Sequence, residues 1–344
     1  MENKMKKLPK ISILLITNNS ARTLDKCFEL LFSQTYPNER IEIIIPDSGS
    51  TDGTLEIIEK YRNKYKNSIT LFHNPRKYKL GRGMGADLAS RRATGDMILM
   101  IDPDNLLIQK DWLENMVKIL IENEDIAAVQ SATIIPESGS VIDKYFGAIG
   151  IEDPFAIPYS LNAQVIFNTK NFAYNPKGFH IYEVNKKDFY YFGDNGFLIW
   201  KDIFFENQGY TQDIDNAYRM AISGKKYKIA VTKDIKIYHN SSNTLSSFLK
   251  KKGFYVRIYI SNNKETRSFN WFNLRRNTIK QNTKFIKSVL FNLMFLPALF
   301  TSLKFFFKER KEFWFVHPIM LFLITLNYIF SFIFVKASGR KFSL

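Results

Sequence analysis

Two aspartates, Asp102 and Asp104, follow a short apolar run at residues 97–101 and are separated by Pro103. A run of this length and composition is typical of a buried strand in a parallel sheet. Ligands of open α/β sheets bind at the carboxyl ends of the strands, and paired carboxylates there suit Mg²⁺ or Mn²⁺ carrying a diphosphate. A solvated turn is the alternative, because Asp and Asn are common turn residues.

A third carboxylate, Asp47, follows the apolar run at residues 41–45 and opens a polar segment with two glycines that ends at Thr54. We expect Asp47 on the same sheet edge as the paired aspartates, where it can accept a hydrogen bond from a base N–H or a ribose hydroxyl. A helix-capping loop without a ligand is the alternative, and it accounts for the Ser-Thr-Asp part of the segment better than for Asp47 itself.

The elements that would position these side chains alternate between apolar strands and amphipathic helices. This rhythm predicts a doubly wound, mostly parallel sheet flanked by helices. An irregular, aromatic segment at 136–191 interrupts it, and regular structure resumes at residue 196. The predicted strands are 11–16, 41–45, 69–72, 97–101, 126–129, 196–200, 227–231 and 236–239; the predicted helices are 21–33, 54–65, 85–93, 110–121, 202–207 and 213–223.

Charge is distributed unevenly along the 344 residues. Residues 241–344 hold 18 Lys and Arg against 3 Glu and no Asp, whereas residues 1–240 hold 31 basic and 30 acidic residues. A basic region of this kind indicates nucleic acid or an anionic membrane surface as the partner. The single cysteine, Cys27, excludes an internal disulfide, which fits a reducing, cytoplasmic location.

The composition of the C-terminal region favours a membrane surface over nucleic acid as the partner. Residues 313–335 are 23 residues without Asp, Glu, Lys or Arg; as a helix they would reach about 35 Å. Residues 288–303 form a second uncharged run, and a charged hinge at 308–312 separates the two. A nucleic-acid-binding protein would not place its charge beside such runs. We expect a domain at 1–240, a basic helical connector at 241–284 and a hydrophobic helical hairpin at 285–344, transmembrane or interfacial. Two core helices of a soluble domain are the alternative.

The segment Asp47-Ser-Gly-Ser-Thr-Asp-Gly-Thr54, followed further along by Asp102-Pro-Asp104, resembles the inverting glycosyltransferase family 2, of the GT-A fold. The resemblance covers residues 11–239. It implies a nucleotide-sugar donor, a divalent metal (Mg²⁺ or Mn²⁺) and inversion at the anomeric carbon. It also implies that Asp47 holds the nucleobase, with Thr17 and Asn19 beside it. Asp102 would face the ribose or the metal, and Asp104 would ligate the metal.

Two further parts of the resemblance assign residues to the sugar diphosphate and to the acceptor. In the Gly-rich segment, Ala86 stands where the family has Arg, so Arg82 is expected to supply the diphosphate contact, and Asp87 is expected to face the sugar. Asp213 matches the catalytic base, although helix N-capping is its alternative role. His239 would join the metal or the diphosphate, although a lone His is usually structural.

Together these features predict a hexosyltransferase that acts on a lipid-linked or polyprenyl-phosphate acceptor at the cytoplasmic face of the membrane, in cell-envelope glycan synthesis. Two departures from the family pattern, Ala86 and Gln212 in place of Arg and Glu, leave one alternative open: a catalytically impaired member that acts as a scaffold in glycan or polysaccharide assembly. A nicotinamide dehydrogenase is disfavoured, because no Gly-x-Gly-x-x-Gly follows the first predicted strand.

Overall fold

The computed structural model describes residues 8–66, 68–74, 82–149, 174–186, 190, 192–210, 214–241, 244–262, 268 and 279–338. The chain divides into two compact units. The sheet unit comprises Met1–Ile134 and Phe172–Asn240, and the helical unit comprises Ile135–Asn171 and Ser241–Leu344. This grouping differs from the division at residue 240 that charge suggests, because residues 135–171 join the C-terminal helices.

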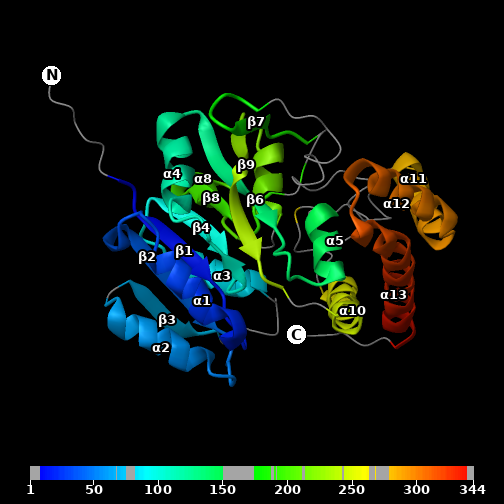
Figure 1. The fold of residues 1–344 in the computed structure, drawn as a ribbon, viewed down its shortest axis with the longest axis horizontal. Helices are drawn as coiled ribbons and strands as arrows, with labels where there is room; N and C mark the ends of the chain where they lie inside the picture. The colour runs from blue at the N-terminus through cyan, green and yellow to red at the C-terminus, as the bar shows by residue number, and fades with distance from the viewer. Residues whose placement is uncertain are drawn as a thin grey trace. The chain divides into compact units, whose positions relative to one another are not determined.

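The sheet unit is built on one mixed sheet, with nine strands among the described residues (Figure 1). The strands are β1 (Ile11–Leu15), β2 (Ile41–Asp47), β3 (Ile69–His73), β4 (Met97–Ile101), β5 (Asn105–Leu106), β6 (Ile126–Ile134), β7 (Phe179–Glu183), β8 (Phe197–Trp200) and β9 (Lys228–His239). Their order is β3-β2-β1-β4-β8-β6-β9-β5, and β7 pairs with β9. The first four strands are parallel, as predicted.

Strand β8 lies antiparallel between β4 and β6. The apolar pattern could not predict the antiparallel direction of β8, because a strand buried on both faces has the same apolar composition in either direction. The two strands predicted at 227–231 and 236–239 are one continuous strand, β9. Its register against β6 shifts between Gln130 and Ala132, which accounts for the polar break in its sequence.

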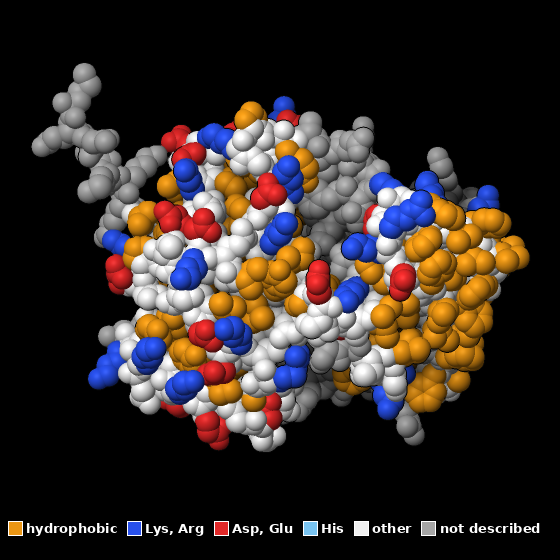
Figure 2. All heavy atoms as spheres, in the orientation of Figure 1, with side chains coloured by type: hydrophobic (Ala, Val, Ile, Leu, Met, Phe, Trp, Pro, Cys, Tyr) orange, Lys and Arg blue, Asp and Glu red, His pale blue; other side chains and the backbone are white. Residues whose placement is uncertain are grey.

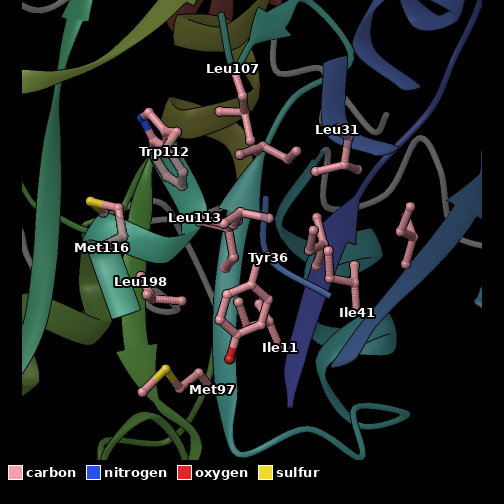
Figure 3. Packing of buried hydrophobic residues seen from close by; sticks show 14 of the residues in the cluster. Ile11, Leu31, Tyr36, Ile41, Met97, Leu107, Trp112, Leu113, Met116 and Leu198 are labelled. Carbon is pink, nitrogen blue, oxygen red and sulfur yellow. The ribbon is translucent and has the colours of Figure 1, made fainter. Parts of the chain in front are cut away.

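Helices cover both faces of the sheet. The core cluster joins alternate residues of β1, β2 and β4, such as Ile11, Ile41 and Met97, to the apolar faces of three helices (Figure 3). These are α1 (Ala21–Phe32), α2 (Thr54–Lys64) and α4 (Trp112–Glu122); a 3-10 turn, η1 (Asn38–Arg40), precedes β2. The intervening strand residues, such as Leu14, are also buried. Helix α3 (Arg82–Ser90) packs on β1 and β2, and α8 (Lys201–Glu206) packs on β4 and β8. Helix α9 (Asp215–Ile222) precedes β9.

The helical unit has an apolar core of its own. Its elements are α5 (Val141–Ile149), α10 (Leu245–Asn262), α11 (Ile279–Leu293), α12 (Leu296–Glu309), the 3-10 turn η2 (Glu312–Phe315) and α13 (Val316–Ser338). Seven side chains make up the core: Tyr145, Phe146, Ile149, Phe248, Trp314, Met320 and Ile324. Part of the aromatic segment thus forms a helix, α5, that packs with the C-terminal helices.

Candidate active site

The carboxyl ends of three strands meet at one edge of the sheet. Strands β2 and β4 flank β1 and run parallel to it. Strand β9 runs in the same direction as β4, because β8 is antiparallel to both β4 and β6, and β9 is parallel to β6. Asp47, Asp102 and His239, which stand at or directly after these strand ends, therefore share one edge, where open α/β sheets bind ligands.

Asp47 is buried, with 4% of its surface exposed, and its carboxylate accepts four hydrogen bonds. Oδ1 accepts from the backbone N–H groups of Gly49 and Ser50, each at 2.8 Å, and Oδ2 accepts from Thr17 Oγ1 at 2.8 Å and Ser50 Oγ at 2.6 Å. Burial alone would raise the pKa of Asp47, but these bonds hold it below its ordinary value. Both oxygens are occupied, so Asp47 first of all shapes the loop, and its contact with a nucleobase stays a prediction.

Asn19 joins the loop after β1 to the loop after β2. Its backbone, at a φ of 51°, is left-handed, a conformation that Asn tolerates better than most residues. Its N–H donates to Ser50 Oγ at 2.8 Å, and its Oδ1 accepts from the N–H of Thr51 at 2.9 Å. Asp52 accepts from the first backbone N–H groups of both α1 and α2. The two loops therefore form one hydrogen-bonded unit, and the capping role expected for the Ser-Thr-Asp part is present in Asp52.

Asp104 and His239 are brought together by the short strand β5. Asn105 pairs with His239 in the β5–β9 ladder, and the N–H of Asn240 donates to the carbonyl oxygen of Asp104 at 2.7 Å. His239 Nε2 then lies 3.2 Å from Asp104 Oδ2, and these side chains are 24% and 30% exposed. Both side chains reach solvent in this geometry. The expected role of His239, joining the metal or the diphosphate, stays a prediction.

Asn195 is a neighbour of Asp102 that the sequence reasoning missed. Its Nδ2 donates to Asp102 Oδ2 at 3.1 Å, and its own carbonyl accepts from Gln130 Nε2 at 3.0 Å. The next residue, Gly196, has a φ of 75°, and a Cβ there would collide with Ser131 Oγ. Asn195 stands directly before a predicted strand, but only the reversed direction of β8 brings it to this edge.

The fit of a divalent metal can be tested against these side chains. No group of three His, Cys, Asp or Glu side chains stands ready to hold an ion anywhere in the described part of the chain. Asp102, Asp104 and His239 nevertheless supply two carboxylates and an imidazole, a donor set that suits Mn²⁺ and, through the carboxylates, Mg²⁺. In this arrangement Asp104 contacts His239, and Asp102 accepts a hydrogen bond from Asn195. A metal would therefore compete with these two contacts. The chemistry of these donors suits such an ion, but the present arrangement does not gather all three around one position, and the metal stays a prediction.

Cys27 lies on α1 and is buried in the core of the sheet unit. Burial raises the pKa of its thiol to about 12, and the negative charges of Asp104 and Asp102 act in the same direction. The thiol is therefore protonated near neutral pH and cannot serve as a thiolate ligand to a metal at this edge.

The other predicted site residues fall on α3 and on the segment before α9. Arg82 opens α3, and its side chain lies outside the described residues. Asp87 is described, and its Oδ2 lies 2.9 Å from Arg91 Nε in an ion pair within the helix. Ala86 is fully buried, so this position offers no charge to a ligand. Asp213, the predicted base, lies outside the described residues, as does Gln212.

The start of α9, directly after these residues, is anchored by buried polar contacts. Asn216 Nδ2 donates to the carbonyl oxygens of Phe204, Asn207 and Gly209. Arg219 lies 3.6 Å from Asp215 and donates to the carbonyl oxygen of Asn207. Burial lowers the pKa of Arg219, and Asp215 opposes that effect. The helix is thus fixed to the α8–α9 connection.

Comparison with known proteins identifies the family and supports the fold. Residues 12–182, about half of the chain, match the family model described as glycosyl transferase family 2. The matched stretch contains the Asp47 loop and the Asp102–Asp104 pair. The chain therefore belongs to glycosyl transferase family 2.

Two relatives show the extent of the similarity. The chain is 27% identical over 139 residues to glycosyltransferase AglE of Haloferax volcanii, covering 40% of this chain and 44% of that protein. The match thus spans less than half the length of that relative. The chain is also 23% identical over 334 residues to the dolichyl N-acetyl-alpha-D-glucosaminyl phosphate 3-beta-D-2,3-diacetamido-2,3-dideoxy-beta-D-glucuronosyltransferase of Methanococcus voltae, covering 91% of this chain and 92% of that protein.

Among solved structures, mannosyltransferase PcManGT from Pyrobaculum calidifontis, in complex with GDP-Man and Mn²⁺, is similar with a TM-score of 0.53. The similarity covers 94% of this chain and 88% of that chain at 14% sequence identity. At this identity the likeness concerns the fold, and it confirms the fold class predicted from the sequence.

Proposed function

We propose that this protein transfers a hexosyl group, with inversion, from a nucleotide-sugar donor to a lipid-linked or polyprenyl-phosphate acceptor at the cytoplasmic face of a membrane. The observation that carries the proposal is the meeting of Asp104 with His239, next to Asp102, at the sheet edge where the Asp47 loop also ends. In a chain of this family, such an edge suits a nucleoside diphosphate attached to a sugar.

The donor's nucleoside would lie against the loop unit of Thr17, Asn19 and Asp47. The internal hydrogen bonds of this unit fix its shape before any ligand arrives, and a preformed site loses less conformational freedom on binding. The diphosphate would extend toward Asp102, with Arg82 as a further contact and Asp87 facing the sugar. Support for this donor class comes from PcManGT, whose structure contains GDP-Man.

Asp102, Asp104 and His239 would hold the divalent metal, Mg²⁺ or Mn²⁺. When bound, such an ion neutralises the charge that develops on the departing diphosphate. Asn195 would keep the Asp102 carboxylate oriented toward it through the 3.1 Å hydrogen bond. The Mn²⁺ in the PcManGT structure supports the choice of metal class.

In the transfer step, an acceptor oxygen forms a bond to the anomeric carbon as the bond from that carbon to the diphosphate oxygen breaks. For a hydroxyl acceptor, Asp213 would take the proton. A phosphate acceptor is already anionic and needs no base. The Methanococcus voltae relative carries a dolichyl-linked sugar phosphate in its name, which supports a lipid-linked acceptor with a free hydroxyl.

Asp213→Asn distinguishes these acceptors. With a hydroxyl acceptor, we expect turnover to fall by about 1,000-fold or more, because the variant lacks the carboxylate that would take the proton. With a phosphate acceptor, we expect a loss of less than about tenfold. The donor is found first by a thermal-shift screen of nucleotide sugars with Mn²⁺, because a ligand that binds the folded state raises the melting temperature. If no donor raises it, the proposed function is wrong.

One observation favours a second candidate, a catalytically impaired member that acts as a scaffold. Ala86 is fully buried at the position where the family resemblance calls for a charged Arg. Metal-dependent hydrolysis of a nucleotide sugar by the wild-type protein would exclude this candidate. Donor binding without hydrolysis or transfer, with every acceptor class supplied, would establish it.

A further inference from the structure

The helical unit exposes a large apolar surface on α11, α12 and α13. Phe300 is 71% exposed and Met294 is 63% exposed, well above what isolated apolar side chains on a soluble protein need. Figure 2 shows hydrophobic side chains gathered over these helices. We call this the apolar face; its members are Ile286, Leu290, Phe291, Met294, Phe295, Leu296, Phe300, Phe307, Phe315, Ile319, Phe330, Phe332, Ile333 and Phe334.

Basic side chains accompany the apolar face. Exposed lysines lie on these helices at Lys287, Lys304, Lys308 and Lys336, and Lys311 is exposed directly before η2. Long basic side chains can lie along an apolar surface while their charge reaches a polar headgroup. A second copy of this chain is a poor occupant, because it would bring two strongly basic surfaces together. The surface of an anionic lipid leaflet complements both the apolar and the charged components.

Helix α13 is long enough to cross a bilayer, but one of its faces is fixed inside the helical unit. Its 23 residues would reach about 35 Å, and a third of its most apolar stretch is buried. The buried face repeats along the helix at Leu321, Ile324, Ser331 and Val335. Asn327, on the same helix, donates from Nδ2 to the carbonyl oxygen of Leu249 in α10 at 2.9 Å. Helix α13 is therefore one wall of a packed unit.

The helix that covers α13 is basic. Gly253 of α10 approaches α13 so closely that a Cβ at this position would lie 2.7 Å from Asn327 Oδ1. The same helix carries Lys250, Lys251, Lys252 and Arg257. A membrane-crossing α13 would either draw these charges into hydrocarbon or separate from α10, and burying charge in hydrocarbon is costly.

Helices α11 and α12 also fail to provide a straight span. Each is too short to cross about 30 Å of hydrocarbon, with lengths of about 22 Å. They are bent by 83° at the break between them, where Phe295 has a φ of 49°. Two short segments at this angle cannot add their lengths along one axis, whereas both can lie along a surface.

We infer that the helical unit binds the surface of an anionic bilayer from one side, with the apolar face in a single leaflet and none of the described helices α11, α12 and α13 crossing the bilayer. This inference deepens the membrane association that belongs to the proposed function. It concerns the manner of attachment, which does not require a bound donor.

The first test measures binding of the full-length protein to vesicles of phosphatidylcholine alone or mixed with phosphatidylglycerol. We expect binding to the mixed vesicles that weakens with added salt. Leu296→Gln combined with Phe300→Gln should weaken it by about tenfold or more, since both side chains are exposed. Leu55→Gln, an exposed apolar position on α2, is the matched control and should bind like wild type. Equal binding by all three proteins, or no binding by any, overturns the inference.

The second test separates surface attachment from spanning. Lys311→Cys and Ser338→Cys place thiols before and at the end of α13; the native Cys27 is buried, so wild type serves as the unlabelled control. In spheroplasts of expressing bacterial cells, a membrane-impermeant maleimide should reach neither thiol, and opening the membrane should expose both. Labelling of one thiol in intact spheroplasts shows a spanning helix and overturns the inference.

These outcomes are separable from those of the proposed function. If a nucleotide sugar raises the melting temperature of the protein but the protein binds no vesicle, only the membrane inference is contradicted. A protein that binds vesicles by this face but responds to no donor contradicts only the proposed chemistry. A protein that ignores vesicles and forms dimers sensitive to Leu296→Gln and Phe300→Gln assigns the apolar face to a second copy and overturns the lipid assignment.

Discussion

Two parts of one sheet edge hold their carboxylates in opposite ways. Asp47 is 4% exposed, and all of its acceptor positions are taken by Thr17, Gly49 and Ser50. Asp104 is 30% exposed and faces His239, itself 24% exposed, at 3.2 Å. A carboxylate enclosed by protein donors keeps a loop in shape, whereas one that is exposed beside an imidazole is able to take a ligand. Substitutions at the two positions should therefore differ in whether they affect stability or catalysis.

Asp104→Asn should have the largest effect. We expect kcat/KM to fall by about 1,000-fold, because an amide is a poor ligand for a divalent metal and carries no charge to pair with it. The melting temperature should stay close to that of wild type, because the side chain is partly exposed. The measurement is steady-state transfer at varied Mn²⁺. Asp125→Asn, which alters an exposed carboxylate paired with Lys228, is the control and should leave activity unchanged.

Asp47→Asn should act chiefly on stability. An amide NH₂ would face groups that now donate to Oδ1 or Oδ2, so we expect a loss of about 3 kcal/mol in the free energy of unfolding. Urea denaturation measures this loss. Thr17→Val removes one of the four donors and should cost about 1 kcal/mol. If Asp47→Asn instead leaves stability intact and raises the KM for the donor, Asp47 contacts the nucleobase directly and the contrast between the two carboxylates is lost.

Substitution of Glu42 tests whether losing a stabilising carboxylate far from this edge lowers stability without changing kcat. Burial would raise its pKa, but hydrogen bonds from Lys10, Ser12 and Thr94 lower it to about 2. A depressed pKa adds stability above the ordinary value of 4.5, and this contribution disappears as the pH falls from there toward 2. Glu42→Gln should cost about 2 kcal/mol at neutral pH.

The same variant has a clear pH signature. The difference in unfolding free energy between wild type and Glu42→Gln should be constant at neutral pH and shrink below pH 4.5, as measured by urea denaturation across that range. The kcat of the folded variant should match that of wild type. A difference that does not change with pH would show that the carboxylate is not charged in the folded protein, contrary to its hydrogen-bond pattern.

Asn195→Ala should have the smallest effect. Removing the amide that orients Asp102 should lower kcat/KM by about tenfold and raise the Mn²⁺ concentration required for half-maximal activity, with little change in melting temperature. Asn185→Ala, which removes an amide that donates to the carbonyl oxygen of Glu183, is the control. If the Mn²⁺ requirement is unchanged while stability falls, Asn195 supports the sheet and not the site.

The sequence predicts the fold largely because its apolar runs are short and well separated. The strands predicted at 97–101 and 41–45 correspond to β4 and β2, and the aspartates at their ends reach a common edge as expected. The direction of β8 and the pairing of β5 with β9 could not be read in advance, because both depend on contacts between distant segments. Asn195 was missed for this reason. The expectation for His239 came from the family resemblance, and its role at the site stays a prediction.

The saturation of Asp47 could not be predicted either. A Ser-Gly-Ser-Thr segment has the same composition whether its hydroxyl and amide groups point toward Asp47 or toward a ligand. Folding decides this through the left-handed backbone of Asn19 and the bridge between Thr17 and Asp47. The sequence thus indicates which residues meet, and the three-dimensional arrangement decides which of them remain exposed.

The path of the chain also has a practical consequence. Because α5 belongs to the helical unit, the polypeptide passes between the two units three times, at 134/135, 171/172 and 240/241. A protein shortened at Asn240 would keep Tyr145, Phe146 and Ile149 but lose Phe248, Trp314 and the other partners that bury them. Such a fragment would leave these three side chains without that cover, so removing the helical unit cleanly requires excising both segments and closing the gap with a new loop.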